Sequence, residues 1–320
     1  MTRRSAISSL LLAPLAAPAA SNSQRAEELR RLRWGMFVCW SFSTFSDREW
    51  TRNIKDVAFF HPTGMDTDQW ARTARAAEMG YILLLTKHHD GFCLWDTKTT
   101  GRKVTRSPLG RDVVAAVRHS CDKFGLKLAL YFSEGDWTWP DNKNPEMKRA
   151  QLRELLTGYG PIEYLWMDHA QGDGGLSHKE TFALVKSIQP DCFVGFNHGQ
   201  AAGEVRIGEL GGPGPVNSAD ASGPFSEKGG QYLIAEFAMP ILGTQGRTGR
   251  WFYTNPEDGR SALSPWALLG LYLGAVRYGN LFSLDVGPDR AGRLRPIDER
   301  TLVDAGRLIR QYSACVGQEA

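Results

Sequence analysis

The chain has 320 residues, of which 42% are hydrophobic and 23% charged, and its formal net charge is +3. This length and hydrophobic share suffice for one large barrel or for two smaller domains. The small net charge and the lack of a basic cluster argue against a nucleic-acid partner. The five cysteines are an odd number without metal-ligand spacing, so no disulfide framework is expected.

The first residues have the pattern of a secretory signal peptide. Arg3 and Arg4 precede a short apolar run at 8–15, and small residues fill 16–20. This pattern predicts a signal peptide over residues 1–22, and the arginine pair is compatible with the twin-arginine route. The apolar run is too short to span a bilayer, and no other stretch is apolar enough. We therefore expect an exported protein, periplasmic or extracellular, with no membrane partner.

The rest of the chain alternates between strand and helix patterns. Helices are predicted at 65–79, 111–124, 145–157, 177–189, 265–278 and 297–312. Strands are predicted at 34–40, 81–88, 126–132, 162–168, 192–197, 205–209, 232–237 and 281–286. This alternation predicts an α/β fold, a single (β/α)8 TIM-like barrel over residues 30–315. A doubly wound open sheet is the alternative, although no Gly-rich phosphate turn follows the first strand.

Polar residues gather where the predicted strands end. The run 162–168 is mostly apolar and stops on Asp168, at the end of a barrel strand where the loops that carry chemistry converge. The same end of the barrel would collect Trp40, His88, His89, Tyr131, Asn197, His198, Glu209, Glu236 and Asp285. Three functions fit this set: glycoside hydrolysis by two carboxylates, water activation by a metal, and ligand binding without chemistry.

The metal hypothesis is the weaker of the two enzymatic ones. His88 and His89 are adjacent on an extended segment, so their side chains are expected to point to opposite faces, which disfavours joint ligation. The chain has no His-x-His after the first strand and no His-Glu-x-x-His. We therefore expect no metal and no other cofactor.

The stretch 86–96, TKHHDGFCLWD, resembles the signature of the family 29 glycoside hydrolases, the retaining α-L-fucosidases. The resemblance covers about residues 30 to 312 and is closest to the subgroup that cleaves 1,3/1,4 linkages. Further segments agree with the family in order: Glu49-Trp50, Gly110–Asp112, Leu130–Ser133, Asp136-Trp137, Gln151–Leu155, Tyr159–Ile162, Trp166–Asp168, Gly249–Tyr253 and Asn280–Asp289.

The resemblance implies a retaining exo-α-L-fucosidase that acts on fucosylated oligosaccharides or glycoconjugates. Asp168 matches the nucleophile, which forms a covalent glycosyl-enzyme intermediate. Seven residues match positions that hold the sugar: Trp40, Glu49, Trp50, His88, His89, Tyr131 and Trp251. The family often carries a C-terminal β-sandwich, and we expect none here because the sequence ends at Ala320, directly after the last predicted helix.

Two departures from the family pattern bear on function. The first strand of the family usually ends in His-Trp-Gly, but here it ends in Cys39-Trp40-Ser41, and a thiol is a poor hydrogen-bond donor. A glycosidase for another fucose-like sugar and a sugar-binding relative without turnover therefore remain as alternatives. The acid/base position varies across the family: Glu209 is the first choice, Glu236 the alternative and Glu204 a distant third, for which a loop salt bridge is the competing interpretation.

Overall fold

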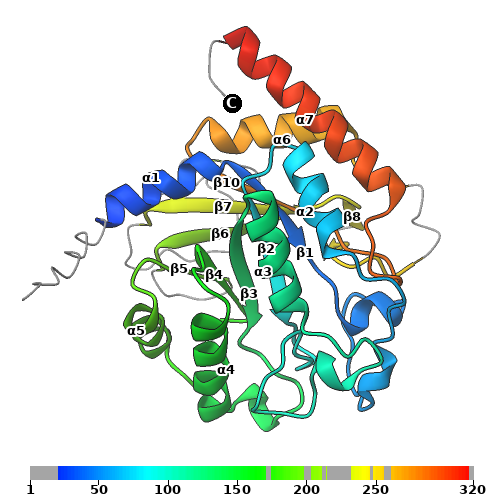
Figure 1. The fold of residues 1–320 in the computed structure, drawn as a ribbon. Helices are drawn as coiled ribbons and strands as arrows, with labels where there is room; N and C mark the ends of the chain where they lie inside the picture. The colour runs from blue at the N-terminus through cyan, green and yellow to red at the C-terminus, as the bar shows by residue number, and fades with distance from the viewer. Residues whose placement is uncertain are drawn as a thin grey trace, which may run out of the picture.

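Eight parallel strands form the centre of the molecule in the computed structural model, which describes residues 21–170, 174–197, 203–210, 214, 232–245, 248–255 and 261–316. Their hydrogen-bonded order is β5-β4-β3-β2-β1-β10-β7-β6 (Figure 1). The bounds are β1 Trp34–Val38, β2 Tyr81–Lys87, β3 Lys127–Ser133, β4 Tyr164–Asp168, β5 Phe193–Phe196, β6 Val205–Glu209, β7 Ile234–Pro240 and β10 Leu281–Asp285. The predicted barrel is confirmed.

Helices surround the strands, and each begins either directly after a polar N-cap residue or at a proline. The carboxylates of Asp66 and Asp112 each accept the backbone N–H of the third residue of the helix that follows. Ser177 and Glu180 form a capping box, and Gly125, with φ 67°, ends the helix that begins after Asp112. The helices are α1 Asn22–Leu32, α2 Thr67–Ala76, α3 Val113–Phe124, α4 Pro145–Gly158, α5 His178–Ile188, α6 Pro265–Val276 and α7 Pro296–Val316. Short 3-10 helices cover Phe42–Phe45, Val57–Phe59, Val104–Arg106 and Pro140–Asn142, and a small hairpin pairs β8 Thr244–Gln245 with β9 Thr248–Gly249.

Helix α1 is an element that the sequence pattern did not predict. Residues 22–29, which were placed before the barrel domain, form its first turns, and Ala26 and Leu29 are buried against the barrel. Arg25 fixes the helix by an ion pair of 3.1 Å to Glu163, which directly precedes β4. The predicted signal peptide lies outside the described residues except for its last two positions.

The barrel has one seam, between β5 and β6. Each other neighbouring pair of strands shares a parallel ladder, whereas the described residues of β5 and β6 do not form one. Glu204 bridges the seam instead, because its backbone N–H donates to the Val194 carbonyl at 2.8 Å and its carboxylate accepts the Val194 N–H at 3.2 Å. Lys186 completes the bridge with an ion pair of 2.7 Å to Glu204.

The strands are buried on both faces, as expected for a parallel barrel covered by helices. Large aromatic side chains, among them Trp34, Trp70 and Trp95, fill the space between strands and helices. None of the helices in the described part of the chain has the length and apolar character needed to cross a membrane.

Candidate active site

A cavity of about 560 Å³ opens where the strands β1 to β4 and β6 end. Eight of the ten predicted site residues line it: Glu49, Trp50, His88, His89, Tyr131, Asp168, Glu209 and Trp251. The remaining lining is Phe37, Cys39, Leu85, Trp166, His169, Leu210, Thr248, Gly249 and Phe252. The barrel therefore brings residues from distant parts of the chain to one concave site, with charged groups above an apolar floor.

Asp168 is the last residue of β4, and its carboxylate is held by donors on both oxygens. Oδ1 accepts the Asn197 amide at 2.9 Å and the His169 backbone N–H at 2.8 Å. Oδ2 accepts the Tyr131 hydroxyl at 2.5 Å and lies 3.6 Å from Nε2 of His89. Burial and the adjacent carboxylate raise the pKa of Tyr131 well above its ordinary value, so the phenol keeps its proton and remains a donor. Donors on both oxygens fix the orientation of this carboxylate.

Glu209 is the last residue of β6 and lies close to Asp168. The Asn197 amide nitrogen that donates to Asp168 also donates to Oε2 of Glu209 at 3.0 Å. Because both bonds share one nitrogen, the two carboxylate oxygens lie within about 6 Å of each other. This spacing suits a pair in which one carboxylate attacks the sugar directly, since a pair that activates a water between them needs more room.

His88 and His89 lie on the same side of the site, so the predicted divergence of their side chains is wrong. Their ring centroids are 4.1 Å apart, and both rings line the cavity. The alternation rule does not apply, because β2 ends at Lys87 and the two histidines lie beyond the pleated strand. Burial lowers the pKa of His88 well below its ordinary value, so its imidazole is neutral. In the described part of the chain, Nδ1 of His88 is buried without a hydrogen-bond partner.

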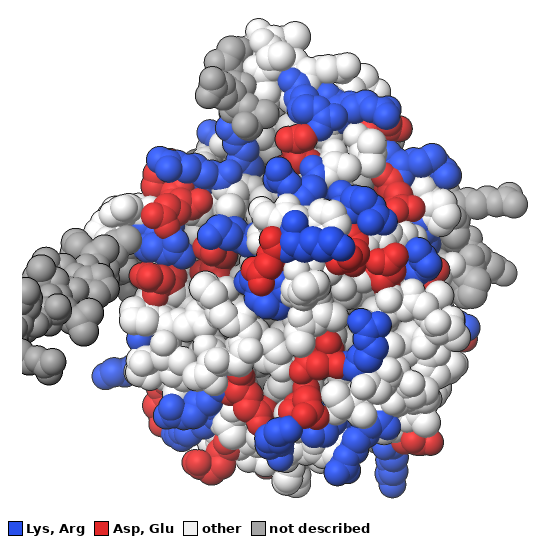
Figure 2. Space-filling model, in the orientation of Figure 1, with Lys and Arg blue, Asp and Glu red and all other residues white. Residues whose placement is uncertain are grey.

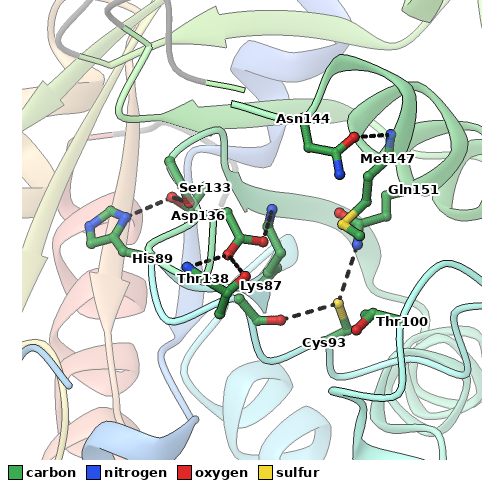
Figure 3. A network of polar contacts seen from close by, with 12 residues as sticks. Lys87, His89, Cys93, Thr100, Ser133, Asp136, Thr138, Asn144, Met147 and Gln151 are labelled. Atoms are coloured by element: carbon green, nitrogen blue, oxygen red, sulfur yellow. Dashed lines mark hydrogen bonds and ion pairs between the residues drawn. The ribbon is translucent and has the colours of Figure 1, made fainter. Parts of the chain in front are cut away.

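The segment that carries His88 and His89 is supported by a buried polar network (Figure 3). Ser133 donates to the Gly135 carbonyl at 2.8 Å, so its oxygen accepts from Nδ1 of His89 at 2.6 Å. Lys87 pairs with Asp136 at 3.5 Å, with side-chain exposures of 4% and 9%. The neighbouring Trp137 backbone N–H donates to the His89 carbonyl at 2.8 Å. The ion pair therefore anchors the loop after β3 to the end of β2, which holds His89 in place.

A family model described as alpha-L-fucosidase matches residues 55–314 of the chain. The chain belongs to this family. Alpha-L-fucosidase 1 of Arabidopsis thaliana is 29% identical over 87% of this chain and 59% of its own length. Tissue alpha-L-fucosidase of Mus musculus is 32% identical over 78% of this chain and 55% of its own length. The chain thus spans little more than half of these curated relatives.

Solved structures of the alpha-L-fucosidase family have the same fold. Alpha-L-fucosidase isoenzyme 1 from Paenibacillus thiaminolyticus superposes with a TM-score of 0.76 at 26% identity, over 90% of this chain and 76% of that one. A glycoside hydrolase 29 family member from an unknown rumen bacterium superposes with a TM-score of 0.73 at 25% identity, over 92% of this chain and 57% of that one. The barrel of this chain is therefore the fold of glycoside hydrolase family 29.

Glu49 joins two walls of the fucosidase-family cavity. Its Oε2 accepts the backbone N–H groups of Trp251 at 3.0 Å and of Phe252 at 3.1 Å. The carboxylate therefore ties the loop after β1 to the segment after β9 and places the Trp251 ring against the site. Trp50 lies at the rim, where 45% of the side chain is exposed. An exposed indole at the mouth offers a flat surface for a sugar ring beyond the cavity.

Cys39, the departure from the family pattern, lines the cavity with its thiol near Asp285. The Cys39 backbone N–H donates to Oδ1 of Asp285 at 3.2 Å, and the thiol also hydrogen-bonds with this carboxyl. Burial raises the pKa of Cys39 and of Asp285 well above their ordinary values. The thiol therefore keeps its proton at neutral pH and brings no negative charge to the cavity.

Glu236 does not reach the cavity, which corrects its place as the alternative acid/base. The strand begins and ends later than predicted, at Ile234 and Pro240, because residues 238–240 continue to pair with β10. Glu236 is consequently an interior residue of the barrel with no exposed surface, in register with Ile207 two residues before Glu209. Its Oε2 accepts the Trp166 indole N–H at 3.1 Å from below the floor. A group at this depth cannot protonate a glycosidic oxygen.

The buried carboxyl of Glu236 makes stability depend on pH. Burial raises its pKa from 4.5 to about 7, so the folded state holds the proton more tightly than the unfolded state. The free energy of unfolding therefore falls by about 3 kcal/mol as the pH rises from 4.5 to 7. Glu236→Gln should remove this loss. The free energy of unfolding of the variant relative to that of the wild type should therefore rise from pH 5 to pH 8. Urea unfolding at both pH values measures this gain.

Glu146→Gln, at an exposed position of α4, is the control for the charge change. It should follow the wild type at both pH values. If the Glu236→Gln and wild-type stabilities stayed parallel between pH 5 and pH 8, Glu236 would have an ordinary pKa in the folded protein.

Two other predicted residues lie outside the cavity. Trp40 is fully buried, donates its indole N–H to the Asp289 carbonyl at 3.1 Å and packs against Trp70. Its position therefore does not support the predicted contact with the sugar. Glu204 forms the ion pair of the seam instead of an acid/base contact. His198 lies outside the described residues.

His169 and Asn197 are site residues to which the sequence analysis gave no role. His169 has φ 55°, which is uncommon for a residue other than glycine, and this conformation points its N–H at Asp168. The feature of the sequence that could have indicated a role for His169 is its position directly after the predicted nucleophile. Asn197 directly follows β5 and is predicted at the correct end of the barrel, but its bridging of the two carboxylates depends on the packing of three strands. The described residues contain no group of three His, Cys, Asp or Glu that could hold a metal ion.

Proposed function

We propose that the chain is a retaining exo-α-L-fucosidase that hydrolyses terminal α-L-fucosyl linkages. The observation that carries this proposal is the contact of one Asn197 amide with both Asp168 and Glu209, which supports a role for these two neighbouring carboxylates as a retaining pair. Membership of the alpha-L-fucosidase family supports the choice of fucose as the sugar.

The two carboxylates would act in turn. In the first step an oxygen of Asp168 bonds to the anomeric carbon, the glycosidic C–O bond breaks, and Glu209 gives its proton to the leaving oxygen. In the second step Glu209 takes a proton from water, the water oxygen bonds to the anomeric carbon, and the ester bond to Asp168 breaks. Tyr131 and the His169 N–H would hold the carboxylate of Asp168 in position for attack.

The surroundings of the pair suit a deoxy sugar. Neutral His88 lines the cavity, and His89 lies next to the nucleophile. Phe37, Trp166 and Phe252 provide apolar surface for the methyl group and the hydrophobic face of the ring. A sugar with a charged substituent at the methyl position would lose solvation there without gaining a partner.

The stereochemistry of hydrolysis tests the proposal. 4-Nitrophenyl α-L-fucoside should give α-L-fucose as the first product, observed by proton NMR before mutarotation. Appearance of the β-anomer first would show inversion and overturn the two-step mechanism. No turnover, with binding of fucose detected by calorimetry, would instead favour a sugar-binding relative.

Cys39 supports one alternative, which is activity on another sugar of similar shape. Because the Cys39 thiol is hydrogen-bonded to Asp285, it offers little hydrogen bonding to a sugar hydroxyl in this part of the cavity. A panel of aryl glycosides that differ from fucose at single carbons would reveal this, since one of them would then exceed the fucoside in kcat/KM. For the linkage we propose the 1,3/1,4 class, to which the sequence segments are most similar, and hydrolysis of matched 1,2-, 1,3- and 1,4-linked trisaccharides would test it.

We also propose that the chain is exported to the periplasm or the medium. The basic, apolar and Ala-rich parts of residues 1–22 support this. Expression of the complete chain, followed by mass measurement of the protein from the soluble cytoplasmic and exported fractions, tests it. An uncleaved chain found in the cytoplasm alone would contradict it.

A further inference from the structure

A second groove, of about 1230 Å³, lies at the other end of the barrel. Arg33, Gly80 and Asn280, which directly precede β1, β2 and β10, line it. The catalytic cavity lies at the opposite ends of the strands, and strands of five to seven residues separate the two sites by roughly 20 Å. The groove is therefore distinct from the site of hydrolysis, and its walls come from α1, α2, α6 and α7.

Arginine dominates the charge of this groove. Arg30, Arg31, Arg33, Arg75 and Arg277 line it, while lysine is absent from its described lining. In Figure 2 blue side chains, with red ones between them, cover the upper part of the molecule, where these helices meet in Figure 1. We call this site the arginine groove.

The two acidic residues that line the arginine groove leave three of its five arginines without an ion pair in the described part of the chain. Glu27 is already paired with Arg30 at 3.2 Å, and Glu78 is paired with Arg310. Within the described part of the chain, Arg31, Arg75 and Arg277 have no ion pair. All three are exposed, and they come from α1, α2 and the end of α6. Three unpaired guanidinium groups from three different helices therefore face one concave surface.

The chemistry of the lining favours a polyanion with sugar rings. A guanidinium binds sulfate or carboxylate through two parallel hydrogen bonds, which a lysine cannot do. Tyr312 lies on the same groove with 41% of its side chain exposed, and an exposed aromatic ring is a surface on which a pyranose can pack. We propose that the arginine groove binds an acidic polysaccharide, one that carries sulfate or uronate groups.

This proposal does not depend on fucosidase activity. A polysaccharide held at the N-terminal ends of the strands leaves the catalytic cavity open, because the cavity faces the other way. The groove would keep the protein on an acidic glycan while the cavity remains free to take terminal sugars from neighbouring chains.

The test compares two triple variants that remove the same charge. Arg31→Gln/Arg75→Gln/Arg277→Gln changes the groove, and Lys143→Gln/Arg153→Gln/Lys179→Gln changes three exposed residues elsewhere. Calorimetry with size-defined dextran sulfate and with polygalacturonate measures binding to each acidic group, and neutral dextran is the reference. The wild type should bind at least one acidic polymer with an affinity that falls as salt rises. The groove variant should bind about tenfold more weakly or worse, and the control variant within about twofold of the wild type.

The far-ultraviolet circular dichroism spectrum serves as the folding control, and it should be unchanged in both variants. Equal weakening in the two variants would show attraction by net charge and overturn the proposal. The proposal would also be overturned if the wild type bound neutral dextran as tightly as both acidic polymers, or if it bound neither acidic polymer. Tighter wild-type binding to phosphatidylglycerol vesicles or to polyuridylate than to both acidic polymers would assign the groove to another partner.

Discussion

Replacement of Asp168 by alanine should reduce kcat for 4-nitrophenyl α-L-fucoside by about 10⁴-fold or more. The side chain would form the covalent bond to the sugar, so its loss removes the first step and not a binding contact. An activated leaving group cannot compensate for a missing nucleophile. Initial rates under saturating substrate measure the effect, and KM should change far less than kcat.

Two further variants make this result specific. Asp168→Gly leaves a space that azide can fill, and azide should restore turnover with a β-fucosyl azide as product. Asp285→Asn is the matched control, because Asp285 also ends a barrel strand, β10, but its side chain is not part of the cavity lining. Turnover of Asp168→Ala within tenfold of the wild type would assign the nucleophile to another residue.

Replacement of Glu209 by glutamine should give a loss that depends on the leaving group. For a fucosyl oligosaccharide, whose sugar alcohol needs a proton to depart, kcat/KM should fall by about 10³-fold. For 4-nitrophenyl fucoside the first step needs little assistance, so kcat/KM should fall by about tenfold or less. The contrast between the two substrates identifies the general acid more clearly than either rate alone.

Glu236→Gln is the comparison for this experiment, since the residue is buried below the cavity floor. It should lower kcat/KM for both substrates by the same small factor. If Glu236→Gln discriminated between the substrates and Glu209→Gln did not, the acid/base role would belong to Glu236. The depth of Glu236 in the barrel would then have to change when substrate binds.

The barrel could be predicted because its strands carry an unambiguous local signal. Runs such as residues 81–87 and 281–285 are short, apolar and buried on both faces, and polar caps precede the helices between them. Asp168 could be placed for the same reason, since the strand pattern stops on it. Helix α1 escaped prediction because it is rich in charged residues and buries few of its side chains.

The details of the site depend on distances that a sequence does not contain. Glu209 and Glu236 both appeared to end strands, and their depths differ only because β7 continues to Pro240. The two histidines share one side because β2 stops one residue before them. Asn197 joins two carboxylates from β4 and β6, a relation that exists only after the barrel closes.

The seam between β5 and β6 crosses the catalytic centre. Asp168 and Asn197 lie on one side of it and Glu209 on the other, so the Asn197–Glu209 hydrogen bond spans the gap. A strand pair without a ladder has fewer backbone bonds to break, and such regions open locally before the rest of a domain. We expect the two carboxylates to separate at urea concentrations that leave the remaining strands folded. Activity would then be lost before the circular dichroism of the helices, whereas coincident transitions would show that the Glu204 bridge is as strong as a ladder.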